Sequence, residues 1–195
     1  MSTARSVEIA LFPLDTVLFP GGRLPLRVFE PRYLAMTREC LRDQAPFGVC
    51  LIAEGREVGS PAMPAEVGCL ARIETWETVQ PGLMQLVARG EQRFRLLSTR
   101  VREDGLLLGQ ALPLEAEPPQ AVATRHAPCV DLLRRLVDRF GETHFPPPHA
   151  FDDASWVGHR LAEVLPLDRL ERQRLLVSND ALARLDRLVG QAGRF

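Results

Sequence analysis

Residues 9–34 read IALFPLDTVLFPGGRLPLRVFEPRYL, and this stretch decides how the rest of the chain can fold. It contains three extended apolar pieces, IALF, TVLF and LPLRVF, separated by Pro13 and by the turn Pro20-Gly21-Gly22. Two adjacent glycines allow positive φ angles, which suits a tight turn. Pro31 then takes the first position of an expected helix, where its missing N–H has no intrahelical partner. The stretch predicts a sheet edge and a binding surface, and it holds no nucleophile–base pair.

Strand-like segments dominate the chain as far as residue 115. Turn residues separate them every ~10 residues, and one helix, expected over 31–43, interrupts them. The expected strands after that helix are 47–53, 69–79, 83–90, 93–103 and 106–115, with a bend at Gly90. This order favours an antiparallel, closed or nearly closed sheet over a doubly wound one. Residues 54–67 are rich in Gly, Pro and Glu and predict a mobile surface loop.

The pattern becomes helical after a proline-containing segment, EAEPPQ, at residues 115–120. Apolar residues at helical spacing predict helices over 128–140, 154–165, 169–177 and 181–190. Asp153, Asp168 and the triplet Ser178-Asn179-Asp180 stand where the last three of these would need an N-terminal cap. The sequence therefore predicts an α+β protein with two domains, a β-rich domain over 1–117 and an α-helical bundle over 118–195.

The composition limits the classes of activity. The chain has 195 residues, 46% of them hydrophobic, and a net charge of −1, so no basic field would attract nucleic acid or anionic lipid. All 24 basic residues are arginine. A sequence without lysine contains no P-loop, no Ser-Lys dyad and no Schiff-base lysine. It also lacks G-x-S-x-G and H-E-x-x-H, so we predict no enzyme activity and no cofactor.

The four cysteines and the N-terminus predict a protein of the reducing cytoplasm. Cys40, Cys50, Cys69 and Cys129 show no C-x-x-C spacing, and two of them lie in apolar segments, which indicates buried free thiols. The apolar N-terminal run breaks at residues 13–15, so neither a signal peptide nor a membrane span is expected.

Two clusters of polar residues are candidate sites. The histidines and aspartates between residues 144 and 159 could bind a metal, but their proline-rich context favours solvent-exposed residues, and we predict no metal site. The cluster consists of His144, His149, Asp152, Asp153 and His159. The other is an arginine-rich run: Arg89, Arg93, Arg95, Arg100 and Arg102. Nearby acids and few aromatics favour arginines that pair with carboxylates over a nucleic-acid surface.

The opening stretch also resembles a known family. The segment FPLDTVLFPGGRLPLRVFEPRY, residues 12–33, is very similar to the opening signature of the N-terminal, substrate-binding domain of Lon proteases. Further segments follow in that family's order and spacing over nearly the whole chain: FGV at 47–49, GCLARI at 68–73, RGEQRFR at 89–95 and LPLD at 165–168.

The resemblance implies a PUA-like β pseudo-barrel with one inserted helix, followed by a helical bundle. It also implies a non-catalytic module that binds unfolded or exposed apolar polypeptide segments, as an adaptor in protein quality control. Because the sequence ends at Phe195 without a lysine, we expect a stand-alone protein without the ATPase and protease domains, with a separate protease as a further candidate partner. No membrane partner is expected, and the oligomeric state is left open.

An apolar groove beside the 54–67 loop is the expected polypeptide-binding site. The candidate residues are Phe19, Leu24, Phe29, Glu30, Arg32, Tyr33 and Met63. A structural role for Arg32 and Tyr33, with Arg32 pairing across the strand–helix junction, is an equal alternative. Two other functions are kept as alternatives, an RNA-binding PUA-like module and a small hydrolase or metal protein.

Overall fold

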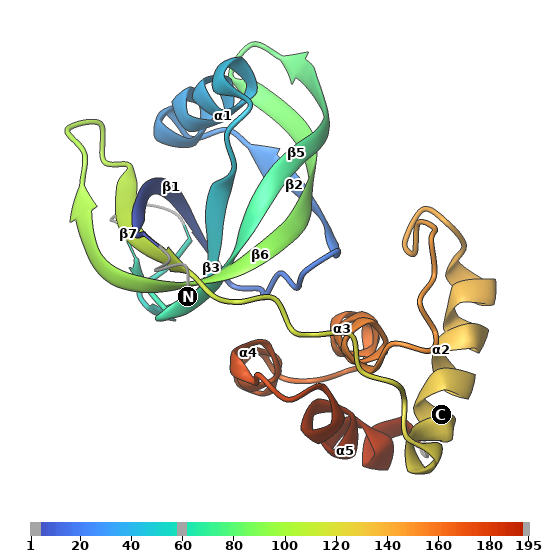
Figure 1. Cartoon of the computed structure of the whole chain (residues 1–195). Coiled ribbons are helices and arrows are strands. Elements are labelled where there is room, and N and C mark those ends of the chain that lie inside the picture. Colours follow the sequence, from blue (N-terminus) through green and yellow to red (C-terminus); the bar gives the residue numbers. More distant parts are fainter. Residues whose placement is uncertain (1–4, 58–61, 193–195) are drawn as a thin grey trace. The chain divides into compact units, whose positions relative to one another are not determined.

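The computed structural model describes residues 5–57 and 62–192 (Figure 1). The chain divides into two compact units, Met1–Glu115 and Ala116–Phe195, and each is considered by itself.

Unit 1 contains a mixed sheet and one α-helix. Its elements in chain order are β1 (Val7–Leu14), β2 (Arg23–Val28), α1 (Pro31–Asp43), β3 (Phe47–Glu54), β4 (Met63–Pro64), β5 (Val67–Gln80), β6 (Leu83–Val101) and β7 (Leu107–Pro113). The helix expected over 31–43 is confirmed with the same bounds, and Pro31 begins it. In the loop predicted at 54–67, Met63–Pro64 pair with β3 instead, while residues 58–61 lie outside the described residues.

The strand pairings form a ring. Strand β1 pairs with β7, then β7 with β6, β6 with β5, β5 with β3, and β3 again with β1. The β1–β3 pair is parallel, with Leu11 opposite Gly48, whereas the other pairs are antiparallel. The expectation of an antiparallel sheet is confirmed at the other pairs and wrong at this one. The connection from β1 to β3 contains β2 and α1, and such a long connection lets a strand return in the same direction.

The turn Pro20-Gly21-Gly22 lies against the middle of β6. Gly21 has φ of 76°, its N–H donates to the carbonyl of Gly90 at 2.7 Å, and the N–H of Gly90 donates to the carbonyl of Gly22 at 2.8 Å. Gly90 was expected to separate two strands, but β6 runs through it without a break. Its missing Cβ serves instead to admit the carbonyl of Phe19, which a Cβ would approach to well under 3.0 Å.

One large core cluster lies between the sheet and α1. Helix α1 contributes Leu34 and Met36, which cluster with Val28 of β2 and with Met84 and Leu86 of β6. A second, smaller cluster contains Ile9, Leu11, Cys50, Phe94, Leu107 and Ala111.

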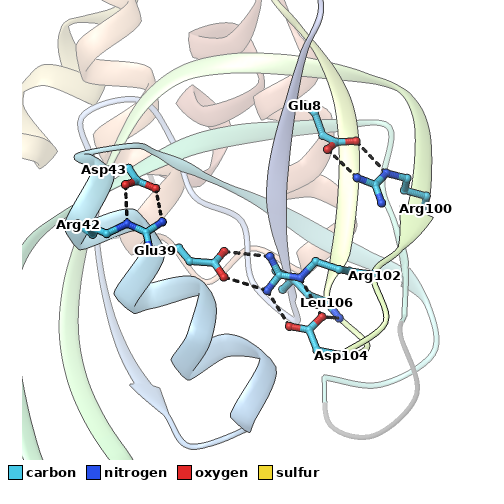
Figure 2. A network of polar contacts seen from close by, with 8 residues as sticks. All are labelled: Glu8, Glu39, Arg42, Asp43, Arg100, Arg102, Asp104 and Leu106. Atoms are coloured by element: carbon cyan, nitrogen blue, oxygen red, sulfur yellow. Dashed lines mark hydrogen bonds and ion pairs between the residues drawn. The ribbon is translucent and has the colours of Figure 1, made fainter.

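Arg102 ties the end of β6 to α1 through an exposed network of charges (Figure 2). Its guanidinium donates to Glu39 of α1 at 3.0 Å and to Asp104 at 2.7 Å. The hydrogen bond from Arg102 holds the pKa of Asp104 at about 2, below its usual 3.8. Because this pKa is depressed in the folded state, the stability it contributes is complete above about pH 4 and disappears as the pH falls towards 2.

We expect Asp104→Asn to lower the free energy of unfolding by about 0.5–1 kcal/mol at pH 7, as for a partly screened ion pair. Urea titrations between pH 2 and pH 7 measure the effect, and the difference between variant and parent should vanish near pH 2. Glu103→Gln removes one neighbouring exposed charge and serves as the control. A difference that stayed constant across this pH range would contradict the role of the Asp104 carboxylate.

Unit 2 is helical. A short 3₁₀ helix, η1 (Thr124–His126), leads into α2 (Ala127–Phe140), followed by α3 (Ala154–Val164), α4 (Arg169–Val177) and α5 (Ala181–Ala192). The predicted caps are confirmed: the carboxylates of Asp153, Asp168 and Asp180 accept from the N–H groups of Ser155, Glu171 and Ala183. Arg184 of α5 is fully buried and paired with Glu117.

Candidate binding site

A groove of about 230 Å³ runs along β2, and we call it the β2 groove. Strand β2 forms one wall, and the end of β1 and the start of α1 complete it. Its lining residues are Phe12, Leu14, Thr16, Leu24, Pro25, Leu26, Arg27, Val28, Phe29, Glu30, Tyr33 and Glu57. Phe29, at this groove, is 54% exposed, although a phenylalanine is usually buried.

The corner where β2 meets α1 is held by stacked rings and a buried cation. The ring of Tyr33 stacks on Phe12 with centroids 4.0 Å apart, and the Arg32 guanidinium lies 4.7 Å from the Tyr33 ring centroid. Arg32 also pairs with Glu30 at 2.8 Å and donates to the carbonyl of Gly105 at 3.3 Å. Burial raises the pKa of Tyr33, so its hydroxyl stays neutral. These contacts join the end of β2 and the start of α1 to β1 and to Gly105.

A second groove, of about 540 Å³, spans β2, β6 and β5, and we call it the Trp76 groove. It is lined by Pro25, Leu26, Arg27, Thr75, Trp76, Glu77, Gln85, Leu86 and Val87. Leu26 and Trp76 both stand opposite Leu86, so these three residues form one row across the three strands. The Trp76 side chain is 54% exposed. Residues 25–27 line both grooves, so β2 is their shared wall.

The structure brings four of the seven predicted site residues together. Leu24, Phe29, Glu30 and Tyr33 line the β2 groove. Phe19 is fully buried, so its side chain is not available to a ligand. Arg32 is buried and lines neither groove, but it pairs with Glu30, which does line the β2 groove. Met63 is 59% exposed but lines neither groove.

Sequence reasoning missed Trp76 and Arg27. A tryptophan in an imperfectly alternating strand was the available signal for Trp76. No sequence signal pointed to Arg27, because strand register decides which residues lie beside it in the sheet.

Four residues of the arginine-rich run form ion pairs with glutamates in unit 1. Arg89 pairs with Glu74, Arg95 with Glu66, Arg100 with Glu8 and Arg102 with Glu39, while Arg93 is buried. Figure 2 shows the Glu8–Arg100 and Glu39–Arg102 pairs. The preferred interpretation, arginines that pair with carboxylates, is confirmed at these four positions.

Three of the histidines and aspartates between residues 144 and 159 lie in environments that do not resemble a metal site. The Nε2 atom of His149 lies 2.8 Å from the carbonyl oxygen of Phe145, Asp153 caps α3, and His159 is buried. In the parts of the chain that the structure describes, no group of three or more His, Cys, Asp or Glu side chains is placed to hold a metal ion.

The four cysteines are free and buried, as the sequence predicted. Burial raises the pKa of Cys50 to about 12 and those of Cys40 and Cys129 to about 11, so these thiols are protonated at neutral pH. Within residues 5–57 and 62–192, no helix is long and apolar enough to cross a membrane.

The mixed sheet followed by helices is the fold of a Lon N-terminal domain. A solved Lon N-terminal domain protein from Xanthomonas campestris superposes with a TM-score of 0.79 and 37% identity, over 94% of this chain and 98% of that one. The chain belongs to the ATP-dependent protease La (LON) substrate-binding domain family, whose model matches residues 8–191.

Two curated relatives are much longer than this chain. The Lon protease of Methylocella silvestris is 36% identical over 81 residues, which is 41% of this chain and 10% of that protein. Protein cereblon of Gallus gallus is 31% identical over 93 residues, 46% of this chain and 20% of cereblon. The chain therefore matches a tenth to a fifth of these relatives' lengths.

Proposed function

We propose that unit 1 is a non-catalytic module that binds polypeptide segments carrying exposed apolar side chains. The observation that carries the proposal is the pair of grooves that share β2 as a wall, with Phe29 and Trp76 each 54% exposed beside them. The substrate-binding description of the family supports the same function.

The dimensions of the β2 groove favour a chain over a compact ligand. Sites for drug-sized molecules and cofactors measure about 300–1,000 Å³; the β2 groove, at about 230 Å³, is smaller, whereas the Trp76 groove, at about 540 Å³, lies within that range. The β2 groove accommodates a few side chains. Because residues 25–27 border both grooves, a polypeptide lying along β2 can place side chains on either side of that strand.

Three finer assignments belong to the same proposal. The ring of strand pairings supports a PUA-like pseudo-barrel as the architecture of the binding domain. The helical domain, assigned from the sequence to residues 118–195, is proposed to be a separate folding unit. The proposed cellular role is that of an adaptor in protein quality control. This adaptor would act in the cytoplasm alongside a separate protease.

The test is binding of an unfolded protein, reduced and carboxymethylated α-lactalbumin, measured by fluorescence anisotropy. We expect Phe29→Ala and Trp76→Ala each to weaken binding by about five- to thirtyfold, as for truncation of an aromatic anchor at roughly 1–2 kcal/mol. Leu97→Ala is the matched control, because Leu97 is 57% exposed and lines neither groove. A folded protein that does not bind the unfolded probe at all would overturn the proposal.

RNA binding remains the alternative prediction. It requires an affinity that falls steeply with salt. The pairing of Arg89, Arg95, Arg100 and Arg102 with carboxylates leaves less positive charge for phosphates than the sequence alone suggested.

A further inference from the structure

Within the described residues, strand β2 pairs with another strand along one edge only. One edge pairs with β6 from Arg23–Arg89 to Val28–Met84. On the other edge, no strand of the described residues pairs with it. The β2 groove runs along this strand, with five consecutive β2 residues, 24–28, in its lining.

Register shows which main-chain groups face that edge. The carbonyl of Gly22 accepts from the N–H of Gly90, so residue 22 bonds towards β6. In an antiparallel pair the bonding direction alternates along a strand, so residues 24, 26 and 28 also bond towards β6. Pro25 and Arg27 therefore face the open edge, and Pro25 agrees with this assignment because proline is tolerated only where no ladder N–H is needed. The edge offers the carbonyls of both residues and the N–H of Arg27.

The two faces of the sheet beside this edge carry side chains of different polarity. Phe12, Leu14 and Tyr33 make the groove side apolar. Arg27 borders both grooves and alternates with Leu26 and Val28 along β2; it is exposed and forms no ion pair with any residue that the structure describes. The acids of the groove are already engaged, since Glu30 pairs with Arg32 and Glu57 accepts the N–H of Asp15. A strand laid on this edge would thus place apolar side chains in the groove and alternate ones near an arginine.

Charge gives no reason to prefer a second copy of this chain as the occupant. Two β2 strands paired antiparallel about Pro25 would set Arg23 of each copy opposite Arg27 of the other. Like charges directly opposite each other destabilise a strand pair. Arg23 already pairs with Glu74 at 2.7 Å, so Arg27 is the arginine that complements a segment carrying an acidic side chain.

We propose that polypeptide substrates bind by adding an antiparallel or parallel strand to the free edge of β2, with apolar side chains in the β2 groove and an acidic side chain at Arg27. The inference rests on the proposed function and adds its binding mode and ligand chemistry. Main-chain hydrogen bonds then supply affinity for many sequences, and alternate side chains supply preference.

The probe is a fluorescein-labelled peptide, TVTVEVTVT, with blocked ends. Two isomers carry N-methyl groups, one at three odd-numbered residues and the other at three even-numbered residues. A strand bonds a partner through one edge only, so one isomer should lose about tenfold or more in affinity while the other binds nearly as the parent does. Equal binding of both isomers would overturn strand addition, and binding of the unfolded α-lactalbumin would still stand. If neither peptide nor α-lactalbumin binds, the proposed function itself fails.

Arg27→Glu tests the charge preference. Replacing the central glutamate of the peptide by lysine should weaken binding to the parent protein by about two- to fivefold, and Arg27→Glu should reverse this preference, as for an exposed ion pair. Arg5→Glu is the control, with the same change of net charge before the start of β1. An unchanged peptide preference in Arg27→Glu would overturn the acidic assignment. Sedimentation that shows dimers of the parent protein, dissociated by the peptide, would overturn the choice of a substrate over a second copy.

Discussion

Gly90→Val should destabilise unit 1 by at least about 3 kcal/mol, the largest effect we expect for a single substitution in the sheet. The Cβ would lie well under 3.0 Å from the carbonyl oxygen of Phe19, and a backbone atom cannot rotate away as a side-chain end can. Overpacking alone costs about 1–3 kcal/mol. Separating the turn from β6 also breaks the bonds of Gly21 and Gly22 to Gly90, at about 0.5–1.5 kcal/mol each.

Urea unfolding followed by hydrogen exchange of the β6 amides measures this loss in unit 1. Gly190→Ala is the control: nothing lies within 4 Å of its added Cβ, and it stands inside α5, so stability should be unchanged or slightly higher. A Gly90→Val protein with the parent's exchange rates in β6 would show that the Phe19 segment does not pack against that strand.

Arg184→Met should destabilise unit 2 by about 3–5 kcal/mol, because removing one partner of a buried ion pair leaves the other charge uncompensated. The Arg184 side chain is fully buried and that of Glu117 is 7% exposed. The guanidinium also donates to the carbonyls of Leu175 at 3.1 Å and Ser178 at 2.7 Å. One side chain thus joins the segment before η1, the end of α4 and α5.

The unfolding of unit 2 can be followed separately through Trp156, in a background where Trp76 is replaced by phenylalanine. Adding Glu117→Gln to Arg184→Met should recover part of the lost stability, since the orphaned carboxylate is then gone. Arg187→Met removes an exposed arginine 3.5 Å from Glu171 and should change stability by less than about 0.5 kcal/mol. Equal losses from Arg184→Met and Arg187→Met would refute the importance of the buried pair.

Local chemistry made much of this fold predictable from the sequence. The proline-started helix α1 and the aspartate-capped helices α3 and α4 depend on neighbours within four residues, and they appear where expected. The family resemblance, carried by segments spread over the chain, is confirmed by the match over residues 8–191.

Long-range contacts were not predictable in the same way. The parallel pairing of β1 with β3 depends on where a distant strand returns, which periodicity does not encode. The sequence pattern predicts that Gly90 breaks a strand, yet Gly90 lies inside one continuous strand. The carbonyl of Phe19, some seventy residues earlier in the chain, packs where a side chain at position 90 would lie.

The candidate site was partly predictable for a related reason. Apolar residues of the opening stretch identify the region, but their exposure depends on what covers them. In the sequence, Phe19 and Phe29 both stand in apolar runs. The structure buries Phe19 completely and leaves Phe29 54% exposed.

Pro25 leaves the free edge of β2 with one main-chain hydrogen-bond donor fewer. A sheet edge with every donor intact is a template on which strand can follow strand, the route to fibrils. One missing N–H in the middle of six residues shortens the ladder that any guest can build. A guest strand held by so few bonds is released again, so an edge of this kind can bind an extended chain without seeding an aggregate.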